Sequence, residues 1–449
     1  MNRIARGCVL FVLAWSGGQA LAGGATPLTP GFADTRPQIN PRVAYDGKET
    51  FLVVWQQGRH YHEQQEGDIL ALRLDLEGRP LDDRPLRVCT HAGSQERPRV
   101  VFSDGYFHLA WQDLRNGRDW DVYGARIDPD GTLLDEEDGV ALAAGAGNQA
   151  VPVLAAAEGG ALLVWQHSDG DGFYELRGVT LSAEAVGEAL PLVHAGGNPG
   201  PWYGYSPGFG FLGEPLTQPP RHDEHLRGGG VALARAGAGW LLSWNDEANW
   251  GFGGATGITR RFARLTRHGE RLVVEDVHRA PTPPVGQRGG DFAVGPDSSL
   301  YASAGTLGRG KEVATAILFS NRGPAVPRPN PNREPERLGS GWDPEHTALI
   351  FDHGLQVQGP VAATLFGKAF TLVTPGLAAA KPPHSRRLYL SRLAADGRRL
   401  DNNATVIHEG LQSPANPDIA ASPEGLLLVF EQGDENGHRR IWNLLLGEH

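Results

Sequence analysis

Cysteine, methionine and long apolar runs are scarce in this chain of 449 residues, which has two cysteines and one methionine. No apolar run is long enough to span a bilayer, so we expect no membrane span. Basic charge is also in deficit, with 41 Lys and Arg against 52 Asp and Glu, for a net charge of −11. This balance, with no basic stripe visible, argues against binding nucleic acid through its phosphates.

The first 22 residues have the pattern of a secretory signal peptide. Arg3 and Arg6 precede a short apolar stretch, and Ala20-Leu21-Ala22 resembles a small-residue cleavage site. Cleavage would leave Cys89 as the single cysteine, which excludes an intramolecular disulfide. We therefore expect a periplasmic or secreted protein whose folded part is residues 23–449.

The chain does contain a sequence repeat, each copy of which predicts four short apolar strands. One copy includes Phe51-Leu-Val-Val-Trp-Gln and Asp68-Ile-Leu-Ala-Leu-Arg, and the next includes His108-Leu-Ala-Trp-Gln and Asp121-Val-Tyr-Gly-Ala-Arg. The tryptophan recurs at Trp55, Trp111 and Trp165, at intervals of 56 and 54 residues. A period near fifty with four strands per copy is typical of propeller blades, where we expect these tryptophans to pack between blades.

The number of copies predicts an all-β fold, a single propeller of seven four-stranded blades. The first strands are expected at Arg42, Arg99, Val151, Gly230, Asp291, Val361 and Asp418. The last copy stops after its third strand, so residues near Thr26 to Ala33 are expected to add the fourth and close the ring. Six or eight blades stay open, because the proline-rich residues 324–344 do not fit the repeat.

The repeat resembles the Val-Val-Trp-Gln, Asp-Val-Tyr-Gly-Ala-Arg and Pro-Asp-Gly-Thr-Leu-Leu-Asp pattern of secreted bacterial β-propeller proteins. These look related to the TolB-like and sialidase-like propellers. The resemblance is clear over residues 36–195 and fades to a hydrophobic pattern beyond them. It implies the fold and no specific activity, because propellers carry many unrelated functions.

Propeller topology predicts where a site would lie. Loops 56–67, 112–120 and 245–257 and an inter-blade insert at about 196–229 should leave from one face. Candidate ligand-binding residues in these segments are Trp202, Tyr203, Tyr205, Asp246, Glu247 and Trp250. The aromatic insert has two interpretations, a lid packed over the channel or a platform for a sugar ring.

A metal site is a further hypothesis for the same face. His222 and His225 stand three residues apart and would share a side only in a helical turn, and a third ligand must come from elsewhere. The acidic turn from Asp113 to Asp121 has the oxygen-rich character that calcium prefers, although aspartates at such positions are more often turn residues. The cofactor is therefore unknown, with a metal ion as the candidate.

Three functions fit these observations. The first is an exported binding or scaffold protein that presents a lidded aromatic and acidic face to a glycan, peptide or protein partner. The second is a carbohydrate-active enzyme, a glycosidase or polysaccharide lyase, whose carboxylates would come from Asp223, Glu224, Asp246 and Glu247. The third is a metal-dependent enzyme that uses His222 and His225. No complete catalytic motif is present, which favours the first.

Overall fold

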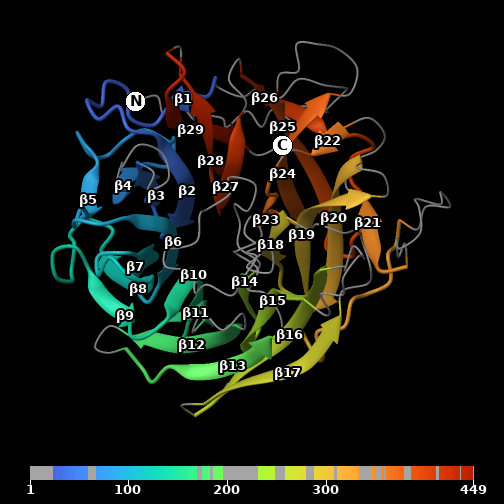
Figure 1. Ribbon diagram of the computed structural model, residues 1–449. Helices are drawn as coiled ribbons and strands as arrows, with labels where there is room; N and C mark the ends of the chain where they lie inside the picture. Colours follow the sequence, from blue (N-terminus) through green and yellow to red (C-terminus); the bar gives the residue numbers. More distant parts are fainter. Residues whose placement is uncertain are drawn as a thin grey trace, which may run out of the picture.

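The computed structural model is a ring of seven antiparallel β-sheets around a central channel, which confirms the predicted all-β, seven-bladed propeller (Figure 1). The structure describes residues 24–58, 67–168, 174–182, 186–195, 231–247, 258–269, 271–279, 288–307, 311–332, 345–349, 355–357, 359–378, 386–410, 414–434 and 436–447. Within these ranges there is no helix, and so none that could cross a membrane.

The blades follow one another in chain order, and each runs outward from the channel. Blades 1 to 3 consist of β2 (Gln38–Tyr45), β3 (Phe51–Gln57), β4 (Asp68–Leu74) and β5 (Leu86–Cys89); β6 (Gln95–Ser103), β7 (Tyr106–Asp113), β8 (Asp121–Ile127) and β9 (Val140–Ala143); and β10 (Asn148–Ala157), β11 (Gly160–Ser168), β12 (Tyr174–Ser182) and β13 (Leu190–Ala195). Blades 4 and 5 consist of β14 (Val231–Ala236), β15 (Gly239–Glu247), β16 (Ile258–His268) and β17 (Arg271–Arg279); and β18 (Arg288–Val294), β19 (Ser298–Leu307), β20 (Lys311–Ser320) and β21 (Thr347–Leu349). Blade 6 consists of β22 (Leu355–Val357), β23 (Ala362–Phe366), β24 (Ala369–Ala378), β25 (Arg386–Ala394) and β26 (Thr405–Glu409), and blade 7 of β27 (Ala415–Ser422), β28 (Gly425–Gly433), β29 (Arg439–Gly447) and β1 (Thr26–Pro27).

The core lies between the blades. The second strands β3 and β11 are buried along their whole length, since both of their faces are covered by neighbouring sheets. Trp55 packs with Leu427 and Val429 of blade 7, and Trp111 packs with Leu52 of blade 1. The four tryptophans of the repeat, at 55, 111, 165 and 244, are at most 2% exposed. Their predicted role in blade-to-blade packing is confirmed.

The ring closes where the sequence predicts. Thr26 and Pro27 pair with Asn443 and Trp442 of β29, so the amino-terminal segment supplies the outer strand of the last blade. The Thr26 hydroxyl donates to Asn443 Oδ1 at 2.7 Å, and the Leu28 N–H donates to the Ile441 carbonyl at 2.8 Å. The closing strand has two residues, shorter than the segment from Thr26 to Ala33 that was expected.

Two blades depart from the repeat. In blade 5 a proline-rich segment follows β20, and the outer strand β21 forms only at residues 347–349. In blade 6 the innermost strand is divided, because β22 and β23 pair with successive parts of β24. These departures explain why the sequence left the blade count open, and the structure settles it at seven.

Candidate functional site

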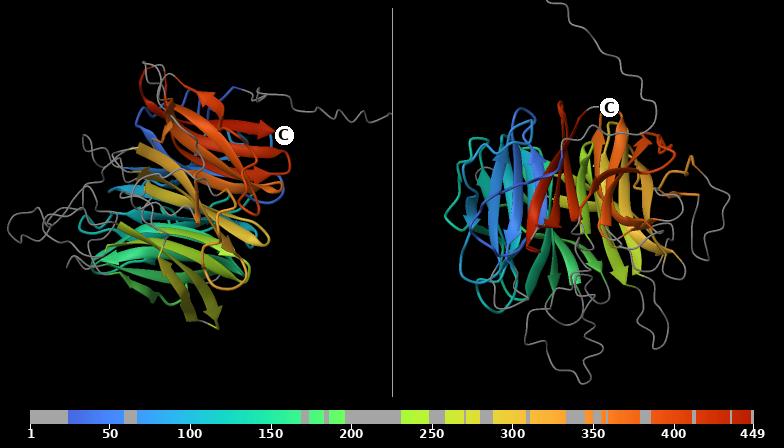
Figure 2. Two further views of the ribbon diagram at one scale, coloured as in Figure 1. Left: turned by 90° about the vertical axis from the view of Figure 1, so that its right-hand side faces the viewer. Right: turned by 90° about the horizontal axis from the view of Figure 1, so that it is seen from above.

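The ring has two ends, seen from the side in Figure 2. We call the end where the second strands terminate the loop face and the opposite end the turn face. Each blade repeats the same up-and-down strand order, so β3, β7 and β15 all end at the loop face, at Gln57, Asp113 and Glu247. The strand ends from which loops 56–67, 112–120 and 245–257 leave therefore lie together, as propeller topology predicts.

A belt of hydrogen bonds joins neighbouring blades at the loop face. In several blades the residue that follows the tryptophan or phenylalanine of the second strand accepts from the innermost strand of the next blade. The bonds run from Asn40 N to Glu431 Oε1 at 2.9 Å, from Arg97 N to Gln56 Oε1 at 3.4 Å and from Val151 N to Gln112 Oε1 at 3.2 Å. The three donor residues have φ of 54°, 55° and 54°, and a proline follows each. This uncommon conformation turns each N–H toward the neighbouring blade, so the belt links adjacent blades where the channel opens at the loop face.

In blades 1 and 2 the second residue after the tryptophan accepts a hydrogen bond from its indole N–H. The Trp55 indole N–H donates to Gln57 Oε1 at 3.1 Å, and that of Trp111 donates to Asp113 Oδ2 at 2.9 Å. Both acceptors are fully buried. These polar groups complete the packing of the tryptophans, because a buried indole N–H needs an acceptor.

The acidic turn between β7 and β8 is closed by its own side chains. Arg115 forms an ion pair with Asp113 at 2.7 Å, and Asn116 Nδ2 donates to Asp119 Oδ1 at 2.7 Å and to Asp121 Oδ2 at 2.9 Å. Across the described part of the chain, no three His, Cys, Asp or Glu side chains gather as metal ligands would. The arrangement favours turn-forming residues over calcium ligands here.

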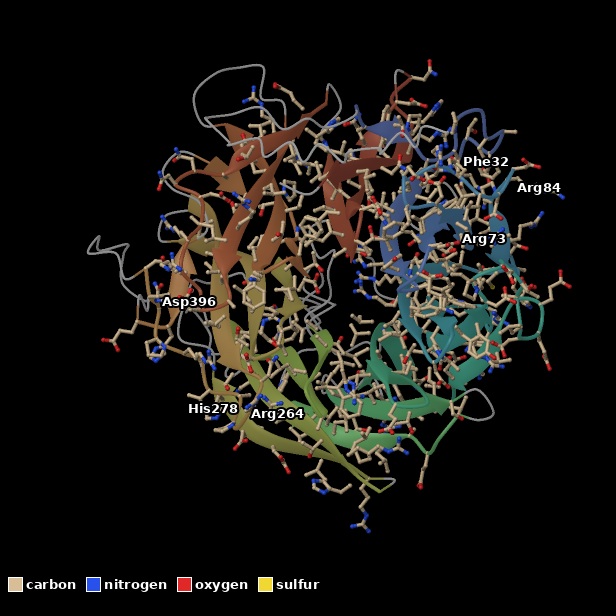
Figure 3. The ribbon with its side chains drawn as sticks, turned by 180° about the vertical axis from the view of Figure 1, so that it is seen from behind. Phe32, Arg73, Arg84, Arg264, His278 and Asp396 are labelled. Atoms are coloured by element: carbon tan, nitrogen blue, oxygen red, sulfur yellow. The ribbon has the colours of Figure 1, made fainter. Side chains whose placement is uncertain are left out.

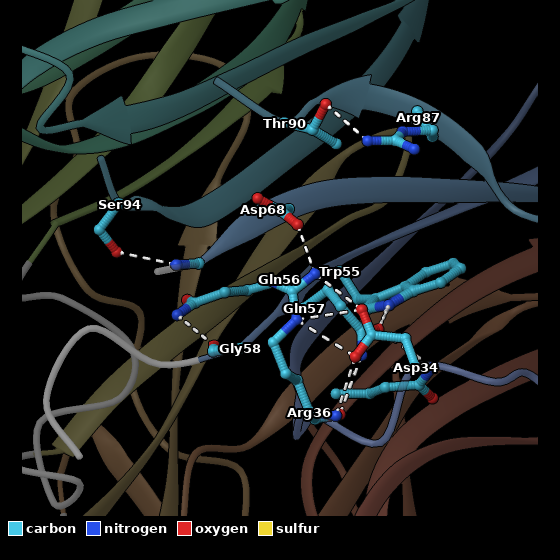
Figure 4. Close-up of polar contacts among 12 residues, drawn as sticks. Asp34, Arg36, Trp55, Gln56, Gln57, Gly58, Asp68, Arg87, Thr90 and Ser94 are labelled. Carbon is cyan, nitrogen blue, oxygen red and sulfur yellow. Dashed lines mark hydrogen bonds and ion pairs between the residues drawn. The ribbon is translucent and has the colours of Figure 1, made fainter. Parts of the chain in front are cut away.

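A groove of about 580 Å³ lies at the outer rim of blade 1, where the ring closes. Its floor is an ion-pair cluster: Arg36 contacts Asp34 at 2.7 Å and Asp68 at 2.6 Å (Figure 4). Burial opposes ionisation of Asp34, but the hydrogen bonds and charge of Arg36 outweigh it and hold the pKa of Asp34 below its usual value. Phe32 and Arg84 border the groove at the rim (Figure 3). The cluster ties the closing segment to blade 1.

The central channel contains a cavity of about 200 Å³ lined by the innermost strands. Its charged residues are Arg42, Arg99, Asp291 and Asp418, all half-buried. Burial, and then the neighbouring Asp418, raises the pKa of Asp291 to about 7. Burial also raises the pKa of Asp418, although Arg42 acts against it. The channel thus holds ionisable groups of both signs, and Asp291 is only partly ionised at neutral pH.

Most residues predicted for the site lie outside the described part of the chain. These are Trp202, Tyr203, Tyr205, Trp250 and the metal candidates His222 and His225. Asp246 and Glu247 are the last residues of β15, where their backbones pair with Thr259 and Ile258 of β16. Their position at the loop face matches the topological expectation, and their roles stay predictions.

Sequence reasoning missed the belt and the charged channel. A signal for both was present, because a glutamine follows the tryptophan in three successive copies and an arginine follows the proline of the innermost strand in two, as Pro41-Arg42 and Pro98-Arg99. The meaning of each residue depends on its neighbour in the next blade, which the sequence does not display.

No family model and no curated protein sequence matches this chain. Among solved structures it is similar to a protein of unknown function from Dyadobacter fermentans, with TM-score 0.51, 10% identity and coverage of 96% of this chain and 99% of that one. It is similar to the polysaccharide lyase Uly1, with TM-score 0.47, 11% identity and coverage of 97% and 94%. It is also similar to Trypanosoma rangeli sialidase in complex with the inhibitor DANA, with TM-score 0.45, 8% identity and 91% coverage, and it spans 55% of that sialidase. The similarity to the Dyadobacter fermentans protein shows a shared fold and says nothing of activity.

Proposed function

We propose that this protein binds a glycan at the loop face. The observation that supports the proposal is the difference between the two ends of the ring. At the turn face, short turns are closed by repeated ion pairs between an arginine of the third strand and an aspartate nine residues later. The pairs are Arg73 with Asp82 at 2.6 Å, Arg126 with Asp135 at 2.6 Å and Arg392 with Asp401 at 2.7 Å. These repeated ion pairs give the turns a structural role.

The loop face instead gathers buried amides and carboxylates around the channel mouth, among them Gln56, Gln112, Gln166 and Glu431. The belt holds this rim rigid, and loops carried by a rigid scaffold are a usual place for binding. The segments that leave this face supply the aromatic residues predicted as a platform. Aromatic rings with amide and carboxylate neighbours suit a sugar, which presents both an apolar face and hydroxyl groups.

The described carboxylates favour binding over catalysis. Glu96 accepts from Ser94 at 3.2 Å and lies 3.5 Å from Gln112 Nε2, while Glu431 forms an ion pair with Arg439 at 3.2 Å. Glycoside hydrolysis needs two carboxyl groups that are available to the substrate. Among the described residues, the buried carboxylates Glu96 and Glu431 of the loop face are engaged by protein groups, so the candidates for a catalytic pair remain Asp223, Glu224, Asp246 and Glu247.

The test is to measure binding to neutral and uronic-acid oligosaccharides on a glycan array and then by calorimetry. Trp202→Ala and Tyr203→Ala should weaken binding by roughly tenfold or more, since each removes a stacking surface. Leu134→Ala, an exposed turn-face change, is the matched control and should bind like the parent protein. Parent protein that binds no oligosaccharide, or loop-face variants that bind normally, would refute the proposal.

The same oligosaccharide samples also distinguish an enzyme from a binding protein, because an enzyme would cleave them. Chain cleavage that is lost on combining Asp246→Asn with Glu247→Gln would replace the binding proposal with a carbohydrate-active enzyme.

A further inference from the structure

Two arginines lie on one wall of the central channel. Arg42 is on β2 and Arg99 on β6, the innermost strands of adjacent blades, and both line the cavity of about 200 Å³. Arg42 Nη1 donates to the Pro41 carbonyl at 2.6 Å, and Arg99 Nε donates to the Pro152 carbonyl at 3.1 Å. Within the described ranges neither guanidinium forms an ion pair. Each guanidinium makes one hydrogen bond to protein within these ranges, which leaves N–H donors for a ligand in the cavity that both arginines line.

The two carboxylates of the cavity accept hydrogen bonds from backbone N–H groups rather than from the arginines. Asp418 Oδ2 accepts from the Val43 N–H at 2.8 Å. Asp291 accepts from Phe292 N at 2.8 Å and from Ala363 N at 3.2 Å, so it links blade 5 to blade 6. These bonds hold both carboxylates against the backbone of the wall.

Position in the ring separates the charges. Blade order places Asp291, in blade 5, three blades from both arginines, across the channel from them. Asp418 belongs to blade 7, which is next to the blade of Arg42. On the other side, the blade next to that of Arg99 is blade 3, which lines the cavity with the apolar Val153. The wall formed by the two arginines is therefore positive, although Asp418 and Asp291 both still attract Arg99.

The pKa of Arg99 shows that placing two cations together in this cavity is electrostatically unfavourable. Burial, and then the positive charge of Arg42, lowers the pKa of Arg99 to about 9. The guanidinium still carries its charge at neutral pH, next to a like charge and against apolar walls. Two cations in such a setting are stabilised by an anion that both can contact, because hydrogen bonds between charged groups are the strong ones.

We propose that the channel binds a small oxyanion between Arg42 and Arg99. The ligand group is a carboxylate, sulfate or phosphate, whose oxygens accept from both guanidinium forks. The cavity is smaller than the pockets that hold drug-sized ligands, which favours a free anion or one anionic group of a larger molecule. This inference stands independently of glycan binding at the loop face.

The experiment titrates the intact protein by calorimetry with sulfate, phosphate and acetate, and separately with trigalacturonate. Saturable binding is expected, and Arg42→Gln and Arg99→Gln should each weaken it by roughly tenfold or more. Arg79→Gln is the matched control, because this exposed arginine lies in a turn on the turn face. The Arg79→Gln variant should bind anions with the same affinity as the parent protein. Binding of the free anions identifies a solution anion as the source. Binding of trigalacturonate alone, with the same sensitivity to Arg99→Gln, identifies an anionic group on a glycan.

A second measurement uses the unaltered chain, so it does not depend on how the variants fold. Saturating sulfate, or trigalacturonate if that is the ligand, should slow modification of Arg42 and Arg99 by phenylglyoxal and leave Arg79 unchanged. The proposal is overturned if none of the four anions binds, if the two glutamine variants bind like the parent, or if the arginines are not protected.

Discussion

Glu431 is the residue whose loss should most weaken the closed ring. Its side chain is fully buried at the junction of blades 7 and 1. It accepts from the Asn40 N–H at 2.9 Å and from Asn416 Nδ2, and its second oxygen lies 3.2 Å from Arg439. Glu431→Ala leaves these donors and one charge without their partner. Removing one member of a buried ion pair costs about 3 to 5 kcal/mol.

The expected change in melting temperature follows from the size of the chain. An entropy of unfolding of about 2.1 cal/mol/K per residue amounts to roughly 0.9 kcal/mol/K for 449 residues. The Glu431→Ala variant should therefore melt about 3 to 5 °C lower, as measured by differential scanning calorimetry. Glu431→Gln keeps an oxygen for the Asn40 N–H and loses only the charge, so its loss should be smaller.

The matched control occupies the same position of blade 2. Gln112 accepts from the Val151 N–H at 3.2 Å and is neutral, so Gln112→Ala should cost about 1 to 3 kcal/mol, less than Glu431→Ala. A decrease of less than about 1 °C for Glu431→Ala would refute the reasoning. So would a larger effect of Gln112→Ala, since the charge-assisted contact would then not be the stronger one.

Three other predictions concern buried polar groups. The pKa of Asp291 is about 7 in the folded protein and about 4 in the unfolded chain, so its contribution to stability is lost as pH rises from about 4 to about 7. Asp291→Asn should remove up to about 4 kcal/mol of this pH dependence, measured by urea unfolding at about pH 4 and about pH 7. Trp111→Phe should cost about 1 to 2 kcal/mol more than Trp165→Phe, because only the Trp111 indole donates to a described acceptor, Asp113; equal unfolding energies would contradict this. Burial raises the pKa of Cys89 to about 12, so a thiol reagent should label it only as the protein unfolds, and rapid labelling of folded protein would be inconsistent with its position.

The repeat could be predicted from the sequence because each blade is defined by local features. An apolar run ending in tryptophan, such as the one at Trp55, is a second strand wherever it occurs. A glycine at a fixed offset, such as Gly78 or Gly131, has a positive φ of 76° or 88° and closes the next turn. The divided innermost strand of blade 6 could not be predicted, because it depends on how β24 pairs with two segments at once.

The belt and the charged cavity are harder to predict because each is made by residues of different blades. The bond from Asn40 to Glu431 joins positions 391 residues apart, and only ring closure makes them neighbours. The sequence predicts Arg42 and Arg99 as the polar starts of their strands, whereas β2 begins at Gln38 and β6 at Gln95, so both arginines lie within a strand. In a closed ring that position faces the channel, so the same two residues become adjacent cations in a small cavity. The chemistry of this propeller therefore depends on the order of residues around the ring more than on any motif along the chain.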